Sequence, residues 1–425
     1  MIRLKSKNFV IILFTQIIGL LASGILSFAM ALHILDTTGS AAIFSTILSI
    51  SFIPTIILGP ISGALADRLP EKALLMFADT TKAIIVTLLG IFLFTDNAPA
   101  LLIAIVLTII TTLTTWYHPI VSAILPKILN KEELIKAAGM VQSVKSLARF
   151  AAPALGGLVY SLIGIYTLVI GIGVLYVISM LSNFFLQLPP KKKEFEGGIL
   201  NGIGHDLKAG LIYITKTDKE VRDLAVMAGV VVMIFYSSLT VAFPFIGRVI
   251  LEINEQQFGV AQAVTGIATL FGALFATRPK IKRFLTRSHL TGWVFAMALV
   301  SLPIGISMIP GLNLSNELSF FIFTSGFFLT MAAIAIINMI KFTTIQKNAP
   351  QDMVGKVIAL SMSITVIGIP VAQLIKGELL ERVVDGYLSL HVLFLSLSVI
   401  TFIVGFIRCF LKRLREGKVD GKYGT

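Results

Sequence analysis

The sequence predicts an all-α integral membrane protein with 12 transmembrane helices in two six-helix bundles and both termini in the cytoplasm. Three observations support this prediction: repeated apolar stretches, a low charge content, and basic residues confined to alternate gaps. The 425 residues are 56% hydrophobic and only 13% charged, with a mean hydropathy of +0.92. A soluble domain has about 25% charged residues, so this chain has too little polar surface to be one.

The apolar stretches set the number and the length of the predicted spans. Each is close to the ~20 residues with which a helix crosses the hydrocarbon core while satisfying its own backbone hydrogen bonds. The first stretch is too long for the core of a signal peptide and a second follows it closely, so we expect an uncleaved first helix. The predicted spans are 9–33, 41–65, 73–95, 101–124, 138–160, 165–187, 224–246, 259–277, 290–309, 319–340, 355–375 and 388–409.

The distribution of basic residues indicates the orientation. Of the 35 Lys and Arg residues, 29 lie at the termini or in gaps that follow even-numbered spans, and only Arg248, Lys376 and Arg382 lie in the other gaps. Positive charge marks the cytoplasmic side, which predicts a multi-pass protein of the cell membrane with both ends inside. The net charge of +13 therefore follows from topology, and no nucleic-acid partner is expected.

The longest gap divides the chain into two sets of six spans. We predict an N-terminal bundle at 1–188, a cytoplasmic linker with a surface helix at 189–223, a C-terminal bundle at 224–411 and a cytoplasmic tail at 412–425. The halves are weakly similar, since Gly139 precedes Pro153 in the fifth span much as Gly355 precedes Pro370 in the eleventh. These matches indicate parallel repeats, an arrangement of transporters that rock two halves about a central site.

The gap after the second span contains a motif, Gly63-x-x-x-Asp67-Arg68-x-Pro70-Glu71-Lys72. A glycine lets helices approach closely, and a carboxylate is favoured at a helix N-terminus. The motif resembles the signature loop of the major facilitator superfamily, which normally reads Gly-x-x-x-Asp-Arg/Lys-x-Gly-Arg-Arg/Lys. Pro70 and Glu71 depart from it. The resemblance implies a gating loop made of Gly63, Asp67, Arg68, Lys72 and Gly355.

The fifth span contains Ala148-x-x-x-Ala152-Pro153-x-x-Gly156-Gly157. Small residues one turn apart permit tight helix contact, and proline adds a kink. The stretch is similar to the exporter-associated motif of the same superfamily, with alanine for its first two glycines. Thr38-Gly39-Ser40-Ala41 and the approach to Gly355 are similar to the macrolide-efflux branch. The resemblance implies a secondary active exporter of an amphiphilic, macrolide-like molecule that works by alternating access and proton antiport.

Charges inside spans are costly and are therefore functional candidates. The four are Asp79, Lys82, Lys145 and Arg149. Asp79 and Lys82 are three residues apart on one helix face, where they form either a structural pair or a coupling site. Lys145 and Arg149 share a face with Gln142 and have no acid in their span, which indicates an acid from another helix or an anionic ligand.

By analogy with the superfamily, the first helix of each three-helix unit lines the central cavity. A mostly apolar wall with scattered hydroxyl and aromatic groups suits a bulky amphiphile better than a sugar. The alternative for each Ser or Thr is a hydrogen bond to its own helix backbone. The candidate lining residues are Gln16, Ser23, Ser27, Thr112, Thr115, Trp116, Gln142, Tyr236 and Asn338.

Two other functions compete with drug export. One is transport of an anionic amphiphile, a lysophospholipid or a siderophore, which would meet Lys145, Arg149 and Lys82. The other, more remote, is a polytopic membrane enzyme that uses His118, although no acid or thiol lies near it in the sequence. No Walker-type phosphate loop is present, so direct ATP use is not expected. We expect no enzyme activity, no cofactor and no metal site. The protein is expected to be a monomer in the lipid bilayer, with its amphiphilic substrate and protons as partners.

Overall fold

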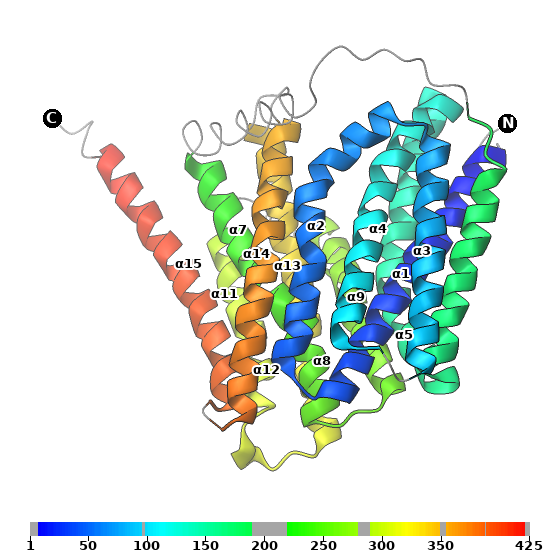
Figure 1. Cartoon of the computed structure of the whole chain (residues 1–425). Helices are drawn as coiled ribbons and strands as arrows, with labels where there is room; N and C mark the ends of the chain where they lie inside the picture. The colour runs from blue at the N-terminus through cyan, green and yellow to red at the C-terminus, as the bar shows by residue number, and fades with distance from the viewer. Residues whose placement is uncertain are drawn as a thin grey trace. The chain divides into compact units, whose positions relative to one another are not determined.

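The computed structural model describes residues 7–95, 98–188, 219–278, 290–348, 354–386 and 388–420 (Figure 1). The predicted spans all fall on helices, to within a few residues at their ends. The part of the predicted linker helix before residue 219 lies outside the described residues. The helices of the first half are α1 (Lys7–Thr38), α2 (Ala41–Arg68), α3 (Glu71–Phe94), α4 (Ala100–Ile128) and α5 (Lys131–Phe184).

The second half contains more interruptions than the first. Two π-helical turns, η3 and η4, continue α7, and a short break separates α11 from α12. Across both halves, eight described helices are long and apolar enough to cross a membrane. In the second half, 290–306 forms a shorter apolar helix. The elements are α7 (Lys219–Ser237), η3 (Ser238–Ala242), α8 (Phe243–Phe245), η4 (Ile246–Ile250), α9 (Glu255–Thr277), α11 (Leu290–Val300), α12 (Leu302–Ile306), η6 (Pro310–Leu312), α13 (Asn316–Asn348), α14 (Val354–Val384) and α15 (Leu390–Asp420).

The chain divides into two compact units. Unit 1 consists of Met1–Ile203, Pro244–Ile250 and Asn254–Ala263, and unit 2 consists of Gly204–Phe243, Leu251–Ile253 and Val264–Thr425. Two short segments after α7 thus group with unit 1. The bundle limits of 1–188 and 224–411 remain a prediction.

Helix α5 of unit 1 contains two of the predicted spans. Gly164 has φ 73° and ψ 170°, a conformation open to glycine, and it breaks α5 into a first limb at 131–163 and a second limb at 165–184. The first limb begins with a capping box, in which the Asn130 side chain accepts a 2.9 Å hydrogen bond from the Glu133 backbone N–H. The break is what allows one continuous element to supply the fifth and sixth spans (Figure 1).

The same helix pairs occur inside each unit. In unit 1, α5 packs along α1 and α3. In unit 2, α14 packs along α7 and α15 packs along α11 and α12, as the corresponding spans would in a duplicated unit. This packing supports the predicted parallel repeats.

Two basic residues are not where the charge pattern placed them. Lys341, assigned to a cytoplasmic gap, lies inside α13 and is only 2% exposed. Lys376, assigned to an outer gap, lies inside α14 with its side chain only 4% exposed. The prediction ended the span at this charge, whereas the helix continues to Val384. At the other end of unit 2, α15 remains helical to Asp420, through most of the predicted tail.

Candidate functional site

Asp79 and Lys82 lie on one face of α3, as their spacing predicts. Their side chains are 0% and 1% exposed, and Lys82 Nζ is 4.0 Å from Asp79 Oδ1. Ionised groups so deeply buried need partners, because removal from water costs each of them several kcal/mol (on the order of 5) before compensation. The remaining contacts of the pair therefore decide what it can do.

Asp79 is held by the second limb of α5. Its Oδ2 accepts hydrogen bonds from Ser179 Oγ at 2.6 Å and from Asn183 Nδ2 at 2.9 Å. These donors are four residues apart and so share a helix face. Asp79 Oδ1 has no hydrogen-bond partner in the described structure, because Lys82 is beyond hydrogen-bonding distance. One carboxylate oxygen is fully bonded, and the other is able to accept a proton.

Lys82 lies between two tyrosine rings. Its Nζ is 5.7 Å from the ring centroid of Tyr117 on α4 and 5.4 Å from that of Tyr176 on α5. Both distances fall within the range of cation–π attraction, which is stronger when the cation is removed from water. Three helices thus surround one ammonium group.

The two tyrosine hydroxyls connect this cluster to α1. Tyr117 donates to Thr15 Oγ1 at 2.7 Å, and the Tyr176 hydroxyl is 2.7 Å from Ser23 Oγ. Ser23 Oγ is also 3.1 Å from Thr114 Oγ1 on α4. We name Thr15, Ser23, Asp79, Lys82, Thr114, Tyr117, Tyr176, Ser179 and Asn183 the buried charge cluster.

Several predicted cavity-lining residues have local partners. Gln16 and Ser23 are buried in unit 1, at 4% and 9% exposure. The Thr112 and Thr115 hydroxyls donate to the backbone of their own helix, at Thr108 and Thr111, as the alternative interpretation held. Ser27, Trp116, Tyr236 and Asn338 are half-buried. Their role as cavity lining remains a prediction.

The second predicted group of intramembrane cations is only partly visible. Lys145 is exposed on the first limb of α5. The side chains of Gln142, Arg149 and His118 lie outside the described part of the structure. A ligand for the Lys145–Arg149 face remains a prediction.

The predicted gating loop forms a tight connection. Helix α2 ends at Arg68 and α3 begins at Glu71, while Gly355 lies in the first turn of α14. The surroundings of Gly63 and the side chains of Asp67 and Arg68 lie outside the described part of the structure. Lys72 Nζ donates to the backbone carbonyls of Phe184 and, at 2.9 Å, Leu186. A cation is favoured at the C-terminal end of a helix, so Lys72 stabilises the end of α5.

Glu71, a departure from the superfamily motif, also has a defined partner. It is 3% exposed and accepts a 2.6 Å hydrogen bond from Lys127 Nζ at the end of α4. The motif would place a basic residue here, beside Lys127. An acid at this position makes an ion pair between α3 and α4 possible.

The exporter-like motif makes the close helix contacts that its small residues predict. A Cβ atom on Gly156 would lie 2.9 Å from Phe28 Cδ1 of α1, and one on Gly157 would lie 2.6 Å from the Glu255 carbonyl oxygen and 2.9 Å from Gly259 Cα of α9. Pro153 lies within α5, one turn before these glycines. The two glycines therefore hold two different segments of unit 1 close to α5.

An ion-pair cluster that the sequence did not reveal lies near the Gly157 contact. Arg248 Nη2 is 2.9 Å from Asp36 Oδ1 at the end of α1 and 2.8 Å from Glu255 Oε1 at the start of α9. Tyr160 donates to Asp36 Oδ2 at 3.3 Å. The only available signal was that Arg248 is a rare basic residue on the outer side. We name these four residues the outer ion-pair cluster.

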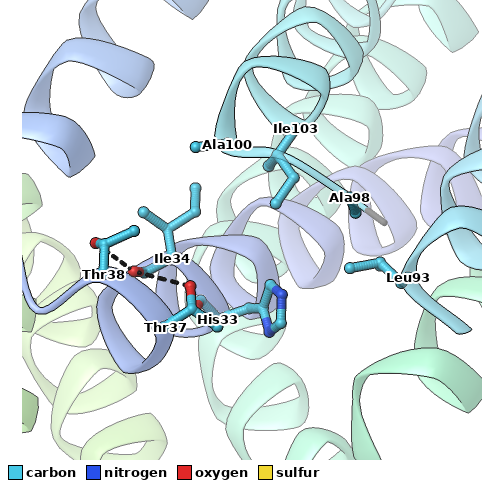
Figure 2. Close-up of a pocket in the computed structure, with 8 residues that line it drawn as sticks. All are labelled: His33, Ile34, Thr37, Thr38, Leu93, Ala98, Ala100 and Ile103. Atoms are coloured by element: carbon cyan, nitrogen blue, oxygen red, sulfur yellow. Dashed lines mark hydrogen bonds between the residues drawn. The ribbon is translucent and has the colours of Figure 1, made fainter. Parts of the chain in front are cut away.

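The structure also has a small pocket at the outer ends of α1, α3 and α4, shown in Figure 2. His33, Leu93 and Ile103 contribute to its wall. The hydroxyls of Thr37 and Thr38 donate to the backbone of α1, at His33 and Ile34. These two hydroxyls donate within the helix but can still accept a hydrogen bond, and the His33 side chain also lines the pocket (Figure 2).

Repeated helix pairs and long apolar spans are the features of a polytopic membrane protein, and charges enclosed at mid-helix are typical of transporters. The model of the Major Facilitator Superfamily matches residues 12–373. The chain therefore belongs to this superfamily of secondary transporters, and the enzyme alternative is set aside.

Curated relatives include drug exporters. Macrolide efflux protein A of Streptococcus pyogenes is 26% identical over 383 residues, which cover 87% of this chain and 88% of that protein. Multidrug efflux pump Tap of Mycolicibacterium fortuitum is 25% identical over 428 residues, or 97% of each. These similarities support a multi-pass transporter of the cell membrane with relatives in efflux families.

Solved structures show the same fold at low identity. The nucleoside transporter NupG has a TM-score of 0.71 and 12% identity, covering 95% of this chain and 98% of its own. A bacterial homologue of the human lysosomal transporter Spinster has a TM-score of 0.69 and 14% identity, with 96% and 98% covered. At such identities the likeness extends to the fold alone.

Proposed function

We propose that this protein exports a macrolide-like amphiphile in exchange for protons by alternating access. The observation that supports this most strongly is the similarity to macrolide efflux protein A along 87% of the chain. The exporter-like residues Gly156 and Gly157 and the largely apolar character of the predicted cavity wall are consistent with it.

Asp79 is the proposed proton carrier. It is the only acidic residue in the twelve predicted spans. Its Oδ1 has no hydrogen-bond partner in the described structure, which leaves a position for a proton, and Lys82 lies 4.0 Å away to compensate the charge when the proton leaves. Intramembrane carboxylates of this kind are typical of proton-coupled pumps.

The test uses purified protein in proteoliposomes loaded with erythromycin. Because protons enter as drug leaves, we expect efflux to accelerate about tenfold or more when the outer solution is one to two pH units more acidic. Asp79→Asn should remove that acceleration. Asp385→Asn is the matched control, since Asp385 is an exposed acid at the end of α14. Erythromycin efflux that ignores the pH gradient in the unmodified protein would contradict proton antiport.

A second candidate, export of an anionic amphiphile, is favoured by one observation: Lys145 is an exposed cation within a transmembrane limb. The same vesicles can be loaded with a lysophospholipid or a siderophore. Transport of these anions without erythromycin efflux, abolished by Arg149→Ala, would support this second function instead.

A further inference from the structure

The charge pair is enclosed by protein in a way that separates it from any substrate. Asp79 and Lys82 are 0% and 1% exposed, and the two tyrosines beside Lys82 are 7% and 0% exposed. A drug molecule cannot touch either charge in this conformation. If Asp79 is the proton carrier, a change in its charge can affect the rest of the protein only through the side chains that contact it.

We propose that Tyr176 and Ser23 are positioning residues that couple the charge of Asp79 to the position of α1, an inference that rests on the proposed proton antiport. Tyr176 contacts Lys82 through its ring and α1 through its hydroxyl. Its ring faces Lys82 Nζ at 5.4 Å, and its hydroxyl bonds Ser23 Oγ on α1 at 2.7 Å.

The geometry around Lys82 makes its position sensitive to the state of Asp79. The ammonium lies 4.0 Å from a carboxylate oxygen but makes no described hydrogen bond to it, and it also lies against two rings. At this distance the attraction between opposite charges exceeds a cation–π attraction. Protonation of Asp79 removes the stronger attraction, so the tyrosine rings become the main partners of Lys82.

Tyr176 is better placed than Tyr117 to pass this change on. Tyr117 bonds Thr15, which also donates to the backbone of its own helix at Ile12. Ser23 lies eight residues further along α1, roughly 12 Å, and its hydroxyl also lies 3.1 Å from Thr114 on α4. Through Ser23, Tyr176 is therefore connected to both α1 and α4.

The other groups that face Asp79 are few. The titratable ones among the described residues are Lys82 on α3, Tyr117 on α4 and Tyr176 on α5. Helix α5 adds the neutral donors Ser179 and Asn183, and α1 presents hydroxyl groups to the tyrosines. No second described acid faces the pair, so the pH dependence of coupling should depend on Asp79 and its immediate contacts.

The experiment compares two kinds of erythromycin transport in proteoliposomes. Exchange of labelled for unlabelled drug needs no net proton movement, whereas efflux driven by a pH gradient does. We expect Tyr176→Phe to retain exchange but to lose gradient-driven efflux by about fivefold to tenfold, the effect of one lost hydrogen bond, with a displaced pH profile. Ser23→Ala should displace the profile in the same direction, and Ser23→Thr should restore it.

Ser182→Ala is the matched control, because the Ser182 hydroxyl donates to the backbone of its own helix at Ile178. An unmodified protein that ignores the pH gradient would reject the proposed antiport and this inference with it. Gradient-driven efflux with an unchanged pH profile in Tyr176→Phe would reject the inference alone. Equal losses of exchange and gradient-driven efflux would also reject it, since they would indicate a purely structural role.

Discussion

The two units join equivalent helix pairs through different kinds of side chain. In unit 1, α3 meets the second limb of α5 through the carboxylate of Asp79 and its donors Ser179 and Asn183. In unit 2, α11 and α12 meet α15, the equivalent pair, through two neutral hydroxyls, Ser301 and Ser398, 2.8 Å apart. Both interfaces are buried, so the charge in unit 1 is not needed merely to join these helices.

Two of the buried lysines differ in the same way. Lys82 in unit 1 has an acid at 4.0 Å, whereas Lys376 in unit 2 has no acidic side chain within ion-pair distance among the described residues and lies 5.7 Å from the Phe394 ring. A repeated architecture thus does not imply repeated charges. The difference leads us to expect ionic coupling at Asp79 and Lys82 in unit 1 and not at Lys376, and the following variants test this.

The largest expected difference is between Lys82→Met and Lys376→Met. Removing Lys82 leaves Asp79 as an uncompensated buried acid, so we expect a loss of about 3–5 kcal/mol in unfolding free energy. Removing Lys376 takes away a buried cation without an acid among the described residues, which should be neutral or stabilising. Thermal unfolding in detergent measures both, and equal destabilisation would contradict the distinction.

A double variant sharpens the same comparison. Asp79→Asn with Lys82→Met removes both charges, and we expect most of the lost stability to return because neither charge is left alone. Gradient-driven efflux should be absent in the double variant, as we expect for Asp79→Asn alone. Restored efflux would mean that the pair is structural and that proton coupling lies elsewhere.

The next effect concerns how α5 and α14 contact their neighbours. Gly157 lies against backbone atoms of Glu255 and Gly259, whereas Gln373 of α14 uses its side chain to donate a 3.0 Å hydrogen bond to Thr240. Gly157→Ala should cost about 1–3 kcal/mol, because backbone cannot move aside easily. Gly171→Ala is the control for thermal unfolding, because a Cβ atom there would meet no side chain or neighbouring helix within 4 Å.

The outer ion-pair cluster should contribute less. Arg248→Gln breaks contacts to Asp36 and Glu255, while Arg382→Gln breaks one contact of unit 2 to Glu378 in which both side chains are 60% exposed. We expect about 1 kcal/mol for Arg248, which is 12% exposed, and close to zero for Arg382. Raising the salt concentration should reduce the effect of Arg248→Gln. A salt-independent effect would mean that it arises from packing.

The smallest effect should come from the neutral interface of unit 2. Ser398→Ala removes one hydrogen bond to Ser301 and should cost about 1 kcal/mol or less. The pH profile of erythromycin efflux should not move. A displaced profile would show that unit 2 also takes part in proton coupling.

The sequence predicted the helices of both halves because each span must satisfy its backbone within itself, which leaves a local apolar signal. It also singled out Asp79 and Lys82, since charge is costly in a span. Their partners Ser179 and Asn183 were not predicted, although their spacing of four residues in the sixth span places them on one face. Neutral polar residues are inexpensive enough in a helix that such a pair is not distinctive.

Two features required the structure. Lys376 was misplaced because a span was assumed to end at its first charge, whereas a long helix can bury a lysine against an aromatic ring. The partnership of Arg248 with Asp36 joins residues 212 positions apart in the chain. No periodicity links positions so distant, so a single sequence contains no local signal for this contact.

The break at Gly164 has a consequence for how the fifth and sixth spans are inserted into the membrane during synthesis. The two limbs of α5 are joined at a single non-helical residue. We therefore expect them to enter the bilayer together, as a helical hairpin. The cation Lys145 in the first limb would then enter alongside the strongly apolar stretch of 151–184, whose mean hydropathy reaches 2.3. A longer, more polar connection at Gly164 would separate the two insertion events and leave the charged limb to enter the membrane alone.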